Sequence, residues 1–92
     1  TWATRGVSAT DVDTFVVGGK TYAIVTAYKD DGVQLIDVSN PSSPKAVGAA
    51  TWGSNGFTEL RGAQGVDTFV VGGKTYAIVT ASVDDGVQLI EI

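Results

Sequence analysis

Two acidic turns are the first candidates for chemistry in this sequence, because the motif Asp-Asp-Gly occurs at residues 30–32 and again at 84–86. Carboxylate oxygens in short loops are ligands for Ca²⁺, but one such turn supplies too few of them, and the spacing of a calcium loop is absent. We therefore expect the Asp side chains to hydrogen-bond the turn backbone and the Gly to adopt positive φ, with calcium binding as the weaker alternative. The carboxylates concerned are Asp30, Asp31, Asp84 and Asp85.

A further acidic pair, Asp13 and Asp67, occupies matching positions at the start of two identical apolar segments. If repeated units closed into a ring, these carboxylates would gather around one mouth, where they would hold a cation or repel anions. Capping at the start of a strand is the favoured interpretation. Arg5 and Arg61 precede the same two segments, and we expect an ion pair with Asp13 or Asp67.

Few residue types are available for catalysis. The sequence contains no His and no Cys, which excludes Ser/His/Asp and Cys/His arrangements and thiolate metal sites. Paired carboxylates for glycoside hydrolysis need different environments, whereas Asp37 and Glu91 occupy equivalent positions of a repeat. Gly-Gly-Lys-Thr at 18–21 lacks the first Gly of a phosphate loop and is typical of a hairpin. We predict that the protein is not an enzyme and needs no cofactor.

Four aromatic residues form the last candidate site: Trp2, Tyr28, Trp52 and Phe57. Aromatic faces stack against sugar rings as well as against each other. Packing in the core or in loops is favoured for each of them, and a carbohydrate platform is the alternative.

The segments that carry these residues belong to a repeat. Residues 12–38 return at 66–92 with identity at 23 of 27 positions and a constant offset of 54. Such a period indicates stacked repeats, in which one unit cannot bury its apolar face without a neighbour. We divide the chain into an N-terminal segment (1–11), a first unit with its connecting loop (12–65) and an incomplete second unit (66–92).

The first unit is predicted to form strands throughout, because β-branched and aromatic residues occur in short runs bounded by Gly, Asp, Asn and Pro. Residues 22–27 are apolar on both alternating faces, which predicts a strand inside a stack of sheets. The predicted strands are 12–17, 20–28, 33–38 and 45–52, with the last at an outer edge.

The second unit has no fourth strand, so its last strand is predicted to form an open edge, which is prone to pair with other chains. Thr1-Trp2 repeats Thr51-Trp52, and we hypothesise that the N-terminal segment of one chain pairs with this edge of a neighbour. The assembly edge comprises Val87, Gln88, Leu89, Ile90, Glu91 and Ile92 on one side and Thr1, Trp2, Ala3 and Thr4 on the other.

The segments GGKTYAIV (18–25) and GVQLIDVSNP (32–41) resemble the LVIVD repeat of bacterial and archaeal surface proteins. The resemblance implies an all-β chain of two tandem β-propeller blades, each with four antiparallel strands, the second blade lacking its outer strand. The period of 54 exceeds the usual spacing of that family. Two blades cannot close a ring that typically has 4 to 8, so we expect several chains to form a ring or a filament.

Composition narrows the choice of partners. Six basic and ten acidic residues give a net charge of −4, the wrong sign for binding nucleic acid, and the apolar runs are too short for a membrane helix. The absence of Met and of an apolar leader suggests a processed or excised chain. We expect a non-catalytic extracellular or cell-surface structural module that associates with itself. The alternatives are a propeller that binds carbohydrate or protein and an engineered symmetric scaffold.

Overall fold

The computed structural model describes residues 9–28, 31–51, 53 and 60–92. Over these ranges the chain forms strands and turns without a helix, which confirms the prediction of an all-β chain. The strands are β1 (Ala9–Val17), β2 (Lys20–Ala27), β3 (Gly32–Asp37), β4 (Lys45–Thr51), β5 (Ala63–Val71), β6 (Lys74–Ala81) and β7 (Gly86–Glu91).

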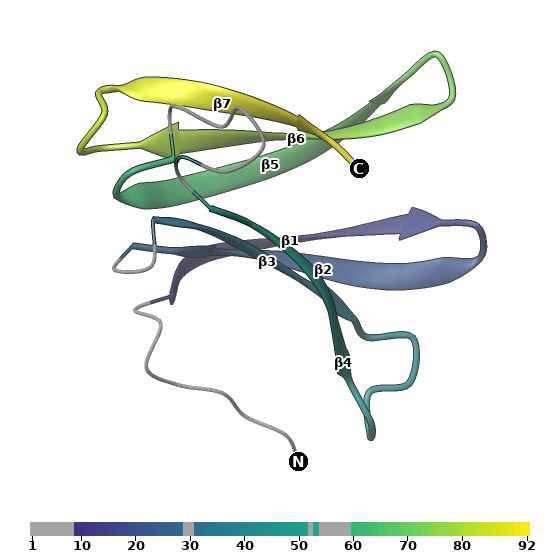
Figure 1. Ribbon diagram of the computed structural model, residues 1–92. Helices are drawn as coiled ribbons and strands as arrows, with labels where there is room; N and C mark the ends of the chain where they lie inside the picture. Colours follow the sequence, from purple (N-terminus) through teal and green to yellow (C-terminus); the bar gives the residue numbers. More distant parts are fainter. Residues whose placement is uncertain (1–8, 29–30, 52, 54–59) are drawn as a thin grey trace.

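The strands form two antiparallel sheets that stack face to face (Figure 1). The first has the order β1-β2-β3-β4 and the second the order β5-β6-β7, so the described part of the second sheet has no counterpart of β4. β1 begins at Ala9 and β5 at Ala63. The boundaries proposed at 11/12 and 65/66 therefore fall inside strands.

The hairpin turns follow from residues that tolerate positive φ. Gly18 and Gly19 join β1 to β2 with φ of 58° and 78°, the conformation that a two-residue primed turn requires. This confirms the hairpin at Gly-Gly-Lys-Thr. In the β2–β3 and β6–β7 turns, however, Asp31 and Asp85 take the positive φ (54° and 53°), whereas Gly32 begins β3. The expectation that Gly would do so was wrong, because Asp also tolerates the left-handed region.

β2 is buried on both faces, as the apolar alternation predicted. Ile24 and Thr26 are buried on the face toward the second sheet, and Ala23 and Ala27 are buried on the opposite face. Strand alternation places these two sets on opposite sides.

The hydrophobic core lies between the two sheets. The buried residues of its cluster are Phe15, Ile24, Val33, Leu60, Ala63, Ala77, Val79 and Ile90. In the first sheet Asp13 lies opposite Ile24, and Ile24 opposite Leu35, so these side chains share the face toward the second sheet. Burying one side chain of this size contributes about 1.5–3 kcal/mol, and the stack is the main source of stability for a chain of this length.

Candidate functional site

The candidate site is the inter-sheet seam, which we define as the contacts of Thr10, Asp11, Asp13 and Thr26 with β5. Asp13 Oδ2 accepts hydrogen bonds from the backbone N (2.7 Å) and Oγ1 (2.8 Å) of Thr68. Asp11 Oδ2 accepts one from Val66 N (3.0 Å). Two carboxylates of the first sheet thus bind backbone amides of the second, which fixes how the sheets align.

The hydroxyl groups of Thr10 and Thr26 contact backbone carbonyl oxygens of β5. Thr26 Oγ1 donates to the carbonyl of Gln64 (3.0 Å) and lies 2.7 Å from Thr10 Oγ1, which is 3.1 Å from the carbonyl of Ala63. Thr26 is fully buried, so its hydroxyl needs such partners. Sequence reasoning missed Thr10, Asp11 and Thr26, since nothing local distinguishes them from other strand residues.

The prediction that Asp13 and Asp67 cap the start of a strand was wrong, because they lie inside β1, which begins at Ala9, and β5, which begins at Ala63. Asp13 Oδ1 accepts from Thr14 N in its own strand (2.9 Å), while Oδ2 binds Thr68. The hydrogen bond from the Thr68 side chain is the main reason that the pKa of Asp13 lies below its usual value. Asp67 Oδ1 likewise accepts from Thr68 N (3.0 Å), so both predicted carboxylates meet at one amide. Asp67 is exposed.

This pKa shift gives the first testable prediction. Because the folded-state pKa of Asp13 is lowered, its ionised form stabilises the fold above the ordinary Asp pKa of about 3.9, and that contribution is lost as pH falls through the folded value. We expect the urea midpoint to fall on acidification below about pH 4. The urea midpoint of Asp13→Asn should be lower than that of the wild type at neutral pH, and it should fall less than the wild-type midpoint when the pH is lowered. A parallel pH profile of the two proteins would contradict this assignment, because Asp37, whose pKa is also lowered by the amide of Ser39, is present in both.

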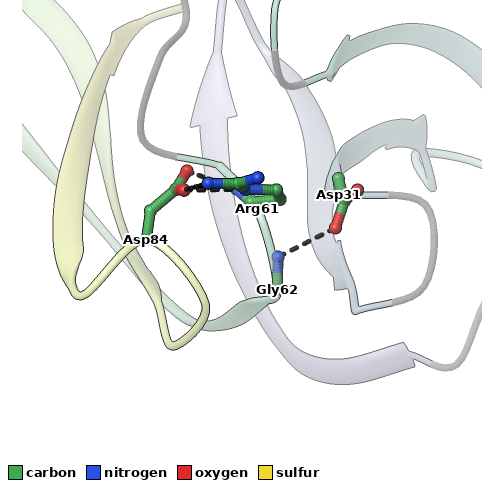
Figure 2. Close-up of polar contacts among 4 residues, drawn as sticks. All are labelled: Asp31, Arg61, Gly62 and Asp84. Atoms are coloured by element: carbon green, nitrogen blue, oxygen red, sulfur yellow. Dashed lines mark hydrogen bonds and ion pairs between the residues drawn. The ribbon is translucent and has the colours of Figure 1, made fainter.

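Both acidic turns bind the segment that leads into β5 (Figure 2). Asp31 Oδ1 accepts from Gly62 N (2.9 Å). Asp84 accepts from Arg61 Nε through Oδ1 (2.9 Å) and from Arg61 N through Oδ2 (3.0 Å), and Arg61 Nη2 lies 2.9 Å from the same Oδ1. The expected pairing of Arg61 with Asp13 or Asp67 was wrong, because the β6–β7 turn closes beside the start of β5. Arg5 and Asp30 lie outside the described residues.

The second prediction concerns this ion pair. Asp84→Ala removes the acceptor of the Arg61 amide as well as the ion pair, and we expect it to lower the free energy of unfolding by about 1–2 kcal/mol. Arg61→Ala removes the side chain, which is 46% exposed, but keeps the backbone N that binds Asp84, and it should cost less than about 1 kcal/mol. Denaturant unfolding of both variants measures the difference, and a larger loss for Arg61→Ala would contradict this division.

The structure brings together only some of the other candidates. Over the described residues, no three carboxylates gather in the manner of a metal site, and Asp31 and Asp84 are engaged as above. Asp37 accepts from Ser39 N (2.9 Å), whereas Glu91 lies 3.8 Å from Lys74 Nζ. Of the aromatic residues, Tyr28 is 38% exposed. Trp2, Trp52 and Phe57 lie outside the described residues.

The described residues of the assembly edge differ in burial. Val87, Leu89 and Ile92 are exposed, whereas Ile90 is buried in the core cluster. Beside β7 an open cleft of about 290 Å³ runs between the sheets, lined among others by Leu35, Ala49, Ile90 and Ile92.

The partner half of that edge, Thr1, Trp2, Ala3 and Thr4, lies outside the described residues.

Comparison with protein-family models, curated proteins and solved structures found no match. In the part of the chain that the structure describes, no helix is long and apolar enough to cross a membrane.

Proposed function

We propose that this chain is a non-catalytic structural module whose repeat units bind one another, so that its working form is an assembly of several copies. A difference in exposure between identical residues carries this proposal. Ile24 is 2% exposed and its counterpart Ile78 is 38% exposed; Val33 is 6% exposed and Val87 is 56% exposed. Ile24 and Ile78 both lie in the middle strand of their hairpins, so the neighbouring sheet accounts for their difference. For Val87, the lack of a counterpart of β4 in the described part of the second sheet adds to the exposure.

The second sheet therefore presents a surface of the same kind as the one that the first sheet buries. We call it the open face. It comprises Asp67, Phe69, Ile78, Thr80, Val87 and Leu89, all exposed. Phe69 stacks on Tyr76 with a centroid distance of 5.5 Å, as Phe15 does on Tyr22, so the face is already shaped as its buried counterpart is. Contiguous apolar surface of this kind marks an interaction site.

The arrangement supports propeller-type blades. The strands of each sheet follow one another in sequence order, and the first strands of the two sheets, β1 and β5, are joined through the inter-sheet seam, as the inner strands of neighbouring blades are. Three or four chains would supply six or eight blades and close a ring, whereas a rotation that does not close gives a filament. An extracellular or cell-surface location is part of the proposal, and the low charge and the abundance of Thr, Ser and Gly are compatible with it.

Light scattering on a size-exclusion column, with negative-stain images of the same peak, tests the proposal. Discrete particles of three or four chains are expected for a ring, and open-ended polymers for a filament. A monomer at every concentration would contradict self-association. The carbohydrate-binding alternative rests on the four aromatic residues Trp2, Tyr28, Trp52 and Phe57. A glycan screen of the protein against its Trp52→Ala and Phe57→Ala variants would test it.

A further inference from the structure

We infer that the open face receives the first sheet of a second copy, and that Asp67 of one copy binds the backbone amide and hydroxyl of Thr14 in the next. This inference rests on the proposed function and specifies which two surfaces meet. It makes the association head-to-tail, since each copy uses two different faces.

The inter-sheet seam within one chain is the template for this junction. There Asp13 binds Thr68 through its backbone N and Oγ1. The counterpart of Asp13 in the second unit is Asp67, and the counterpart of Thr68 in the first unit is Thr14. Both Asp67 and Thr14 are exposed. Strand alternation places Thr14 on the face of β1 opposite to Asp13 and Asp67 on the face of β5 opposite to Thr68, so the two lie on opposite outer faces of one copy.

The apolar residues of the outer face of the first sheet also match those that the second sheet contributes to the core. Ala77, Val79 and Ile90 belong to the core cluster that contains Ile24, and their counterparts in the first unit are identical: Ala23, Val25 and Ile36. These lie on the outer face of the first sheet together with Thr14 and Val12. Ala23 and Ile36 are shielded within one copy, so a second copy gains contact mainly through Val12, which is 55% exposed, the half-buried Val25 and Thr14.

Two contacts of the seam are missing from the junction. Asp11, which binds Val66 N, has Gly65 as its counterpart, and Thr10, whose hydroxyl binds the Ala63 carbonyl, has Gln64. A junction between copies therefore has one carboxylate–amide bond where the internal seam has two. We expect dilution to separate the copies while the two sheets of each chain stay together.

A pair of engineered cysteines tests the orientation directly, because the chain has no Cys of its own. Under oxidising conditions, Thr14→Cys combined with Asp67→Cys should give chains joined by disulfides that reducing agent separates. The matched control is Asp13→Cys with Thr68→Cys, which places the two cysteines at the corresponding contact inside one chain. It should form a disulfide within the chain and should not join two chains. If the wild type assembles and the control bond forms, but the test pair does not cross-link, the orientation is wrong and the proposed function stands. A monomeric wild type would overturn both.

A second measurement does not depend on disulfide geometry. Asp67→Asn replaces a charge-assisted hydrogen bond by a neutral one and should raise the dissociation constant between copies about tenfold. Asp37→Asn removes the same charge from a residue that accepts from Ser39 N within its own sheet and takes no part in the seam, and it should leave the constant unchanged. An unchanged constant for Asp67→Asn in a protein that still assembles would overturn the inference.

Discussion

Replacing Ile24 by alanine should lower the free energy of unfolding by about 2–5 kcal/mol, whereas the same replacement at Ile78 should cost about 1 kcal/mol in the monomer. The two residues are identical in sequence context, but Ile24 is 2% exposed and Ile78 is 38% exposed. Ile24→Ala leaves a cavity between the sheets, and the surrounding strands can close it only in part. Because a small domain has about 5–15 kcal/mol in total, Ile24→Ala threatens the fold.

Urea unfolding of both variants, at a dilution where the wild type is monomeric, measures this contrast. Equal losses under those conditions would show that the two sheets do not differ in burial. At concentrations where copies associate, the open face becomes covered, and the cost of Ile78→Ala should rise toward that of Ile24→Ala. The same pair of variants therefore reports on the core of one chain and on the contact between chains.

Replacing Gly62 by alanine is the second substitution with a large expected effect, a loss of about 3 kcal/mol. Gly62 has φ of 70°, and a Cβ there would lie 2.5 Å from Val83 Cγ2 and 3.0 Å from Val83 N. Alanine is strained at this φ wherever it occurs, and here the new methyl group also meets backbone that cannot rotate away. Moving residue 62 away from Val83 would also disturb the hydrogen bond from its backbone N to Asp31.

Gly18→Ala is the matched control, since Gly18 has φ of 58° but nothing within 4 Å of an added Cβ. It should cost only the conformational strain, about 1–2 kcal/mol. Adding Val83→Ala to Gly62→Ala removes the clash with Cγ2 but not with the backbone, so it should recover part of the stability and not all of it. Equal losses for Gly62→Ala and Gly18→Ala, or full recovery in the double variant, would contradict this account.

Local patterns were sufficient for the strands and the hairpins. The runs of β-branched residues and the Gly-Gly turns act within a few residues, so the bounds of β2 differ from the predicted 20–28 by one residue at one end, and those of β3 from 33–38 by one residue at each end. β1 begins three residues before the predicted 12–17. The apolar alternation of β2 also predicted burial on both faces. The predictions that were wrong, such as the partner of Arg61, depend on which turn lies beside which strand, and this is not a local property.

Asp13 and Asp67 show where sequence reasoning reaches its limit. Their neighbours in sequence are the same, and the sequence alone determined that each would lie in a strand; there each binds the backbone N of the residue that follows it. Only the tertiary structure decided that Asp13 also binds a second sheet while Asp67 faces solvent. The physical reason is that backbone propensity and hydrophobic alternation act along the chain, whereas burial and hydrogen bonding across the inter-sheet seam depend on which face of a repeat meets a neighbour.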